Sequence, residues 1–410
     1  MKKIRTHHKH EEGKKLAYLA LITGIGASLT LPILPTFVKT ILNTDTSVSV
    51  FYSGMAIMML LAALVSTYLF KKVDRAKTVK GSLLITSAVF LFLVFTTRIH
   101  ALSFLISLHV IFALFIAMSL SLYVRDFAKS KNLGEEEGKY FKYSNLGYLI
   151  GPLVGGFTGA YVGYELVFIL SSLTFISAFF YFNHLHIVQN HPVLNSEDQL
   201  KSYQIVPNLK HYFTNKNRCK VFTFTLFLMM WTGFKRLYIP LYVVFSGYIE
   251  SMSGIILALT IVPLILLEVK TGEYADKHGV RKPISMGFII MAVSLLVIFF
   301  SPYTILNFGI LILAHLGMAF VEPLQEYFLF KNMKKEEEDE LYGVYMSADP
   351  IALFITPAIG ALTLLLLPFN YLFLTFGVLM VIASATSWFT LRHSLPDALP
   401  QESSNPEQPL

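Results

Sequence analysis

The sequence is poor in cysteine, tryptophan and charged residues. Its 410 residues include one cysteine and two tryptophans, and only 14% of them are charged. A single cysteine excludes an intramolecular disulfide and also cysteine-based zinc or iron–sulfur sites. Arg218 and Lys220 flank Cys219, which indicates the reducing, cytosolic side of a membrane. We therefore expect no metal and no cofactor.

Most of the chain is apolar. Hydrophobic residues make up 54% of it and the mean hydropathy is +0.59, which excludes an ordinary soluble domain with a polar surface. Phenylalanine and tyrosine are abundant, so aromatic belts at the two membrane interfaces would depend mostly on tyrosine. The composition predicts a protein that crosses the lipid bilayer many times.

Twelve apolar stretches are long enough to span a bilayer, since ~20 helical residues cross ~30 Å of hydrocarbon. They lie near 16–42, 47–70, 80–97, 100–124, 140–163, 164–184, 218–246, 249–270, 283–300, 304–330, 341–366 and 369–391. The predicted fold is all-α integral membrane, with 12 transmembrane helices in two pseudo-symmetric six-helix bundles. The predicted units are a cytoplasmic basic leader (1–15), an N-terminal bundle (16–184), a cytoplasmic linker (185–217), a C-terminal bundle (218–392) and a disordered cytoplasmic tail (393–410).

Lysine and arginine predict the orientation of these spans. Of the 33 basic residues, 29 lie in the leader, in every second loop, in the linker or in the tail. Because basic loops stay on the cytoplasmic side, both chain ends are expected there, in the cytoplasmic (inner) cell membrane. The net charge of +7 follows from this topology, so nucleic-acid binding is not expected.

The two halves resemble each other when the chain is shifted by about 200 residues. Residues 52–54 (Tyr-Ser-Gly) align with 252–254 (Met-Ser-Gly), and His109 aligns with His315. Pro152 similarly aligns with Pro357. Each match pairs spans that are six apart, odd with odd and even with even. The sequence therefore predicts a parallel repeat whose halves can rock about a central cavity.

A run of small residues interrupts the fifth span. It contains Gly147, Gly151, Pro152, Gly155 and Gly156. Glycine costs ~1 kcal/mol and proline ~3 kcal/mol inside a helix, so close backbone packing must offset them. This pattern favours a transporter with moving helices over a simple anchor.

These features resemble the major facilitator superfamily, over nearly the whole chain. The glycine run resembles the antiporter motif of that superfamily, and Pro32 and Pro35 resemble the proline pair of its 12-helix drug:proton antiporters. A third feature resembles its Gly-xxx-Asp-Arg-x-Gly-x-Arg-Lys gating loop: Gly272, Asp276, Lys277, Gly279, Arg281 and Lys282. The segment 71–80 is a degenerate counterpart of that loop, and His109 stands where drug antiporters place arginine. The resemblance implies alternating access.

Acidic residues in the cytoplasmic turns are expected to latch the cavity. A carboxylate there can accept backbone N–H groups at a helix start and pair with nearby cations. We expect Asp74 to act with Arg75 and Asp126, and Asp276 to act with Arg281 and with the acidic run 336–338. The alternative is that these charges only set the topology.

Two carboxyl groups lie inside predicted spans. An ionisable group in hydrocarbon costs ~2.5–3.5 kcal/mol, so each one is first a functional candidate. Glu322 and Asp349 both fall in the inner half of the membrane, and as a pair facing one cavity they could carry a proton. Glu322 is the leading candidate, because Asp349-Pro350 could instead reshape a helix.

The seventh span contains two adjacent cations. Lys235 and Arg236 follow Trp231, and at least one of them is expected to line the cavity and bind an anionic group or a carboxylate. His109 and His315 could shuttle protons or bind substrate, and a structural role remains open for each.

The predicted function is proton-coupled efflux of a small organic molecule by a monomer that is not an enzyme. A proton-independent or symport-type carrier of a sugar or organic anion is the alternative, and a non-transporting sensor with the same fold is a third. No catalytic motif such as HExxH, GxSxG or a P-loop occurs in the sequence, and the partners expected are substrate, protons and lipid.

Overall fold

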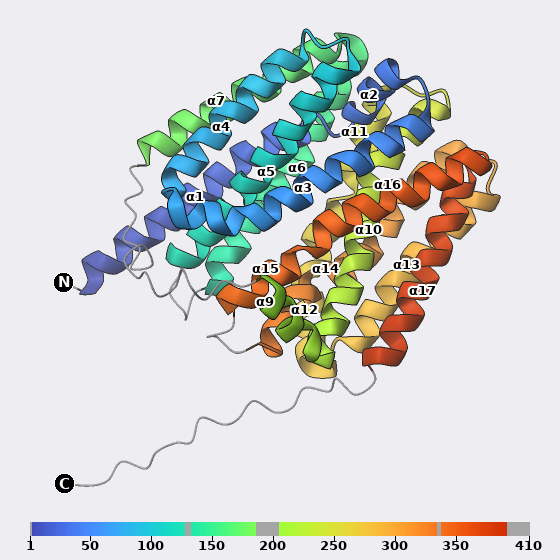
Figure 1. Cartoon of the computed structure of the whole chain (residues 1–410). Coiled ribbons are helices and arrows are strands. Elements are labelled where there is room, and N and C mark those ends of the chain that lie inside the picture. Colours follow the sequence, from blue (N-terminus) through green and yellow to red (C-terminus); the bar gives the residue numbers. More distant parts are fainter. Residues whose placement is uncertain (1, 128–132, 186–204, 334–337, 392–410) are drawn as a thin grey trace, which may run out of the picture.

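The long apolar stretches form helices, because a backbone in hydrocarbon must satisfy its polar groups within the same segment. The computed structural model describes residues 2–127, 133–185, 205–333 and 338–391. Within those ranges the chain consists of helices and turns, without strands. Two groups of roughly parallel helices lie side by side (Figure 1).

The first half of the chain forms one group of helices. They are α1 (Lys2–Ser28), α2 (Leu34–Leu42), α3 (Asp45–Lys72), α4 (Arg75–Leu93), α5 (Ile99–Phe127), α6 (Leu133–Tyr161) and α7 (Tyr164–His184). The predicted first span is therefore two helices, separated by turns over residues 29–33. Pro35 lies in the first turn of α2, where its missing N–H leaves no hydrogen bond unmade.

The second half forms the other group. Its helices are α9 (Ile205–Thr214), α10 (Lys216–Phe245), α11 (Glu250–Leu259), α12 (Val262–His278), α13 (Arg281–Phe300), α14 (Thr304–Lys331), α15 (Glu338–Met346), α16 (Ala348–Leu366) and α17 (Tyr371–Thr390). The predicted linker 185–217 thus contains a helix, α9, and the beginning of α10.

The predicted eighth and eleventh spans are also each two helices. α11 ends before Thr260 and Ile261, and α12 begins with Pro263 in its first turn. α15 and α16 are separated at Ser347, three residues before Pro350. Proline removes a backbone donor and clashes with the preceding turn, so the helix ends before it. The two predicted spans are nevertheless present, as the apolar stretches Glu250–His278 and Leu341–Leu366.

The described part of the chain contains nine helical spans that are long and apolar enough to cross a membrane. The other three of the twelve predicted spans correspond to α1, α6 and α10. The apolar part of α1 is short, Lys15–Ser28, because the turns before α2 interrupt it. α10 contains Lys235 and Arg236, and α6 contains the glycine run, which lowers the apolar content of both.

The same helix pairs recur in both halves. α1 packs on α6 as α10 packs on α16, and α4 packs on α7 as α13 packs on α17. The halves meet where α3 packs on α16 and α6 packs on α11, again two equivalent pairs. This packing is that of a parallel repeat and agrees with the offset of about 200 residues in the sequence.

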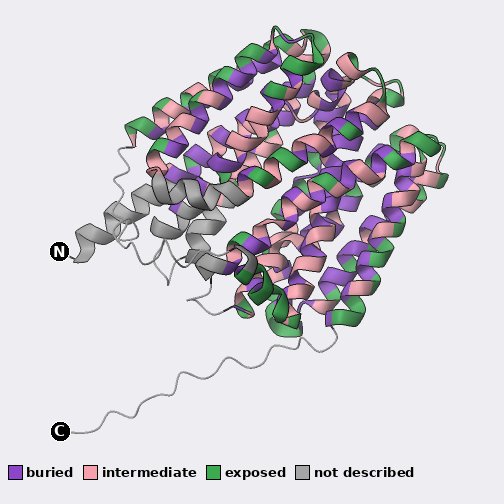
Figure 2. Cartoon of the chain, viewed as in Figure 1, coloured by how far each residue is buried: buried purple, intermediate pink, exposed green. Residues whose placement is uncertain are grey.

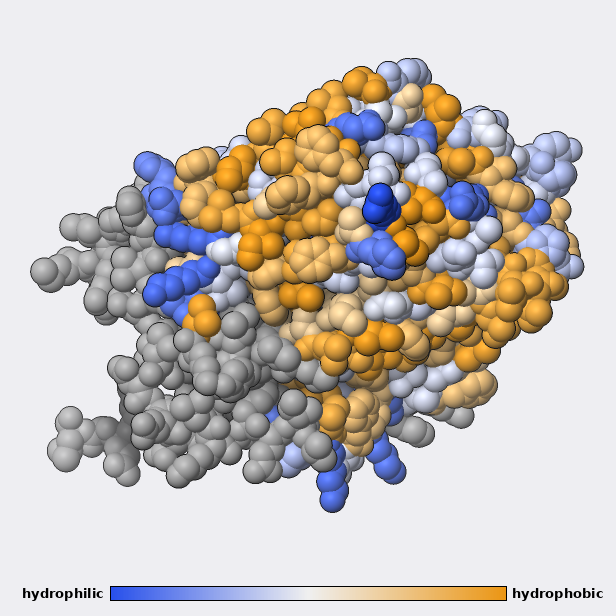
Figure 3. Space-filling model, turned by 45° about the horizontal axis from the view of Figure 1, so that its top comes forward, coloured by the Kyte–Doolittle hydropathy of each residue, from blue (hydrophilic) through white to orange (hydrophobic). Residues whose placement is uncertain are grey.

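Burial follows this arrangement. Buried residues line the helix faces inside each group, and exposed residues lie on the outside (Figure 2). Large apolar side chains are prominent among the exposed ones, for example Phe180 and Leu266, each 64% exposed. Apolar side chains also cover much of the described surface in Figure 3. An apolar exterior of this extent is what a lipid-facing protein requires.

Candidate functional site

The site is built first from α10, which contains the two cations. Trp231, Lys235 and Tyr238 lie at helical spacing on one face of α10, and Arg236 lies about 100° around the helix. Lys235 is buried, with 9% of its surface exposed, and Arg236 is partly buried. α10 contains no aspartate or glutamate, so Lys235 depends on the neighbouring helices for a carboxylate partner.

α14 faces α10 with a histidine and a carboxyl group. His315 and Glu322 lie two turns apart, on the same side of the helix. The Nδ1 of His315 is 2.8 Å from the carbonyl oxygen of Leu311, so in the neutral ring it donates and Nε2 remains an acceptor. The His315 ring is fully buried against the Trp231 indole, with 5.2 Å between ring centroids.

Four helices contribute charges to one region. Glu322 lies within electrostatic range of Lys235 and Arg236, and Arg236 also lies within range of Asp349 in the first turn of α16. Glu268 of α12 is close enough to Glu322 to repel it. We call Lys235, Arg236, Glu322 and Asp349 the buried charge cluster, in which Lys235 is buried and the other three side chains are half-buried. The structure therefore brings together two cations and two carboxylates that are up to 114 positions apart in the sequence.

The four members of the buried charge cluster do not contact one another directly. Between described residues the structure has one salt bridge shorter than 4.0 Å, Lys39–Asp45, and the cluster makes no hydrogen bond there. Within the cluster and beside it on α10 and α14 are buried polar atoms without a hydrogen-bond partner: Glu322 Oε2, Gln325 Oε1, His315 Nε2 and Trp231 Nε1. Unpaired buried polar groups are costly, so this arrangement suits a region that binds a polar ligand.

His109 occupies the equivalent place in the first half but has different surroundings. Its ring packs on Phe90 of α4, with 4.8 Å between centroids, and its Nδ1 is buried without a hydrogen bond. Each of the two histidines therefore lies against an aromatic ring, and only His315 lies beside Lys235. The sequence placed both in one cavity, whereas the structure groups only His315 with the charges.

The turn between α3 and α4 contains the first predicted gating residues. The side chain of Asp74 caps α4 by accepting a hydrogen bond from the backbone N–H of Ala76, at 2.8 Å. The guanidinium of Arg75 lies over the Tyr123 ring of α5, 5.5 Å from its centroid. Asp126 lies in the last turn of α5, and its side chain is outside the described residues.

The second predicted gating segment is mostly helical, so its prediction as a loop was wrong. Gly272, Asp276 and Lys277 lie within α12, while Arg281 and Lys282 begin α13. α12 ends only at Gly279, whose φ of 79° is left-handed and favours glycine.

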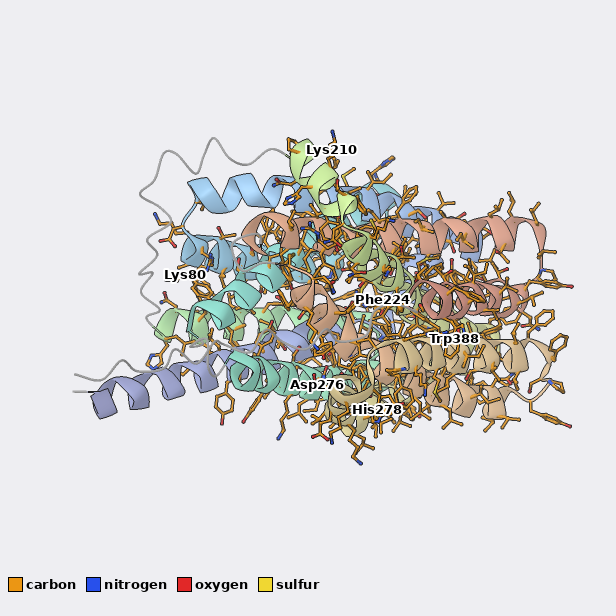
Figure 4. All side chains as sticks on the ribbon, turned by 90° about the horizontal axis from the view of Figure 1, so that it is seen from below. Lys80, Lys210, Phe224, Asp276, His278 and Trp388 are labelled. Carbon is orange, nitrogen blue, oxygen red and sulfur yellow. The ribbon has the colours of Figure 1, made fainter. Side chains whose placement is uncertain are left out.

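The partners of this segment also differ from the expected ones. Asp276 accepts a hydrogen bond from the Tyr327 hydroxyl of α14 at 2.6 Å. Arg281 stacks on the Trp388 ring at 3.8 Å and donates to its carbonyl. Of the expected acidic partners, residues 336 and 337 lie outside the described residues, as does the side chain of Glu338. Figure 4 shows Asp276 and His278 at one edge of the molecule and Lys210 of α9 at the opposite edge.

The glycine run of α6 has two packing faces. A Cβ on Gly147, Gly151 or Gly155 would lie within 3 Å of α1 or of the turn after it, and for Gly155 the distance to the carbonyl oxygen of Leu29 would be 1.7 Å. Gly156 faces the other way, where an added Cβ would lie 2.8 Å from the Cα of Gly254 in α11. The carbonyl oxygen of Pro152, one turn earlier in α6, lies where an added Cβ on Gly254 would be. One helix therefore packs tightly within its own half and across to the other half.

Three hydrogen bonds between described residues join the two halves, and the sequence did not reveal them. Ser49 of α3 pairs with the Tyr238 hydroxyl of α10 at 2.9 Å, and Tyr164 of α7 donates to Glu250 of α11 at 2.6 Å. Ser53 donates to a backbone carbonyl of α16 at 3.4 Å. All three lie on the side of the molecule opposite the turn at Asp74.

Donors for a metal ion are not assembled here. In the ranges that the structure covers, no group of three or more histidine, cysteine, aspartate or glutamate side chains could hold one. The buried charge cluster mixes cations with carboxylates, which suits an organic ligand better than a metal ion.

Comparison with known protein families gives a match over most of the chain. The model of the Major Facilitator Superfamily matches residues 16–261 and 239–409. The chain is also 22% identical over 281 residues to the staphylopine export protein of Staphylococcus aureus, a match covering 67% of this chain and 70% of that protein.

Solved transporter structures share the fold. A crystal structure of the nucleoside transporter NupG has a TM-score of 0.72 and 11% identity, covering 93% of this chain and 99% of that one. A peptide transporter in complex with sulfate has a TM-score of 0.75 and 14% identity, covering 92% and 93%. A POT family transporter in complex with 5-aminolevulinic acid has a TM-score of 0.76 and 10% identity, covering 92% and 95%.

Proposed function

The chain belongs to the Major Facilitator Superfamily, and we propose that it exports a small organic molecule in exchange for protons. It is a multi-pass membrane transporter and not an enzyme. The proposal adds the direction of transport, which is export, and the coupling ion, which is the proton. It also adds the orientation in the cytoplasmic (inner) cell membrane, with both termini in the cytoplasm.

The single observation that supports proton coupling is the position of Glu322. It lies nine residues before the end of α14, about 14 Å at ~1.5 Å per residue, and its Oε2 is buried without a hydrogen bond. Lys235 and Arg236 face it from α10, Glu268 faces it from α12, and Glu326 follows it on α14. A carboxyl group between cations and other carboxyls can gain and lose a proton as these neighbours change.

Export, rather than import, is supported by the relative whose name describes it as an export protein. The proline and glycine features that resemble drug:proton antiporters favour the same direction. Identity of 22% is too low to transfer a substrate, so the proposal carries over only the direction.

Alternating access is proposed to use the two halves, 16–184 and 218–392, as rocking units. The three hydrogen bonds between the halves all lie on the proposed outer side, where they would hold that side closed. The Gly156–Gly254 contact allows α6 and α11 to approach closely and slide, because neither presents a side chain. The segments at Asp74 and Asp276 are proposed to latch the inner side when it closes.

The test uses purified protein in liposomes that enclose a pH-sensitive dye, with amino acids, amines and organic acids added outside. We expect at least one compound to drive proton movement across the membrane in the wild type. Glu322→Gln should abolish that movement, because the amide cannot take up a proton. Glu273→Gln is the control, because this carboxyl group of α12 is exposed and lies outside the cluster. Unchanged coupling in Glu322→Gln would contradict the proposal.

A second candidate function is carriage of an organic anion without proton coupling. The burial of Lys235 beside Arg236 favours it, since two adjacent cations attract an anionic group. A rate of organic-acid flux that does not change with an imposed pH gradient would support this function over the first.

A further inference from the structure

The buried charge cluster contains charges of both signs, and Glu268 and Glu326 add two more carboxyl groups beside Glu322. Lys235 and Arg236 contribute two positive charges, and Glu322 and Asp349 contribute two negative charges when ionised. Removing a charge from water costs several kcal/mol unless a partner compensates it. A ligand with one charge would satisfy one sign only, and would leave opposite charges in the site without a partner.

The cluster charges are held near each other but apart. They interact electrostatically, yet none of the four forms an ion pair shorter than 4.0 Å with another described residue. Their hydrogen-bonding capacity is therefore available to a ligand that reaches both signs. The cations come from α10 and the carboxylates from α14 and α16, so the two kinds of charge are supplied by different helices.

Neutral groups around the cluster add both donors and acceptors. Trp231 Nε1 is a donor, while His315 Nε2 and Gln325 Oε1 are acceptors, and all three are buried without a partner. Trp231 and His315 are 1% and 0% exposed. Phe234 stacks on Trp231 with 5.9 Å between centroids and supplies an apolar surface beside these groups.

We propose that the transported molecule is a zwitterion, whose carboxylate binds Arg236 and Lys235 and whose ammonium group binds Glu322 and Asp349. This inference rests on the proposed function, since the same Glu322 then meets either the ammonium group or a proton. An apolar portion of the substrate packs against Trp231 and Phe234. Such a molecule is an amino acid, a short peptide or an N-substituted amino acid.

The experiment compares ligands that differ only in their charged groups. The first set is phenylalanine, phenethylamine and 3-phenylpropionate, and the second is 6-aminohexanoate, hexylamine and hexanoate, which separates the two charges further. Thermal unfolding of the purified full-length protein in detergent, at increasing ligand concentration, gives an apparent Kd for each compound. We expect the zwitterion of at least one set to bind on the order of thirtyfold more tightly than either singly charged analogue.

Two variants identify which side of the cluster holds which group. Arg236→Gln should weaken binding of the zwitterion and of the acid while leaving the amine unchanged. Asp349→Asn should weaken binding of the zwitterion and of the amine while leaving the acid unchanged. Should a variant fail to fold, the two ligand sets on the wild-type protein still decide the question.

Three results would overturn the inference: in both sets a singly charged analogue that binds as tightly as its zwitterion, no stabilisation by either zwitterion, or identical ligand profiles in the two variants. Binding at equilibrium needs no flux, so the two proposals fail separately. Selective binding of zwitterions without proton movement would contradict only the proposal of proton coupling. Proton movement driven only by singly charged compounds would contradict only the proposal that the substrate is a zwitterion.

Discussion

The two halves of this transporter share a helix arrangement and differ in what their interiors contain. In the first half, the charged side chains that the structure describes lie outside the predicted spans or near the ends of those spans, as Asp74 and Lys39 do. In the second half, Lys235, Arg236 and Glu322 lie deep within helices. Tight backbone packing occurs in both halves, between α1 and α6 in the first and between Gly287 and Gly317 in the second, so the halves differ in their charges.

This difference shows that a repeated fold does not repeat its function. Each charge in a span costs ~2.5–3.5 kcal/mol on insertion scales, and a purely structural helix has no reason to keep it. Concentrating the charges in one half leaves the other free to act as a rigid counterpart. His109 and His315 illustrate the point, because equivalent histidines face Phe90 in one half and Lys235 in the other.

The largest effect is expected at Gly155 of α6, whose equivalent in the second half is Gly360 of α16. An added Cβ on Gly155 would lie 1.7 Å from a backbone carbonyl, which has no way to move aside. We expect Gly155→Ala to destabilise the protein by about 3 kcal/mol or more, measured as folded yield and Tm in detergent. Gly54→Ala is the control, because no atom lies within 4 Å of its added Cβ. Equal stability of the two variants would show that α1 and α6 are not tightly packed.

The second half should tolerate the equivalent change better. A Cβ on Gly360 would meet the Tyr238 hydroxyl, a side-chain atom that can shift more easily than a backbone carbonyl. We expect Gly360→Ala to cost about 1–2 kcal/mol, within the usual range for overpacking. The same Tm measurement checks it, and a loss as large as that of Gly155→Ala would contradict the contrast between backbone and side-chain contacts.

A smaller effect is expected where the halves meet. Tyr238→Phe removes the hydrogen bond to Ser49, while Ser49 keeps its bond to the carbonyl of Asp45 at 2.9 Å. Since such a bond contributes ~1 kcal/mol, the population open to the outer side should rise about fivefold. Spin labels on Thr44→Cys and Ile249→Cys, with Cys219→Ser, would report it as a longer distance population. If Ser49→Ala has no similar effect, the bond does not hold the halves together.

The smallest effect is expected at the salt bridge between Lys39 and Asp45, which lies within the first half. The two side chains are 27% and 18% exposed and 2.8 Å apart. Partly exposed ion pairs contribute ~0–1 kcal/mol, so Lys39→Ala should change Tm little and only at low salt. A large loss of transport in this variant would mean that the first half also contributes charge to function.

The sequence alone determined the membrane class, the spans and the repeat. Apolar length and the distribution of lysine and arginine are properties of the chain that do not depend on contacts, so they could be read directly. The glycine run likewise predicted close packing, because glycine inside a helix needs compensation wherever it occurs. Helix breaks were harder to predict from the sequence. Pro263 and Pro350 interrupt spans, whereas Pro152 and Pro240 lie inside continuous helices.

Only the tertiary structure decided which side chains meet. Helical spacing places Lys235 on one face of α10 and Glu322 on one face of α14, and it gives neither the rotation of those helices nor their neighbours. Arg281 illustrates the limit, since its partner is Trp388, 107 positions away, and not the nearby Asp276. Contacts between distant segments depend on how the helices are packed and rotated against each other, and no local pattern in the chain encodes that packing.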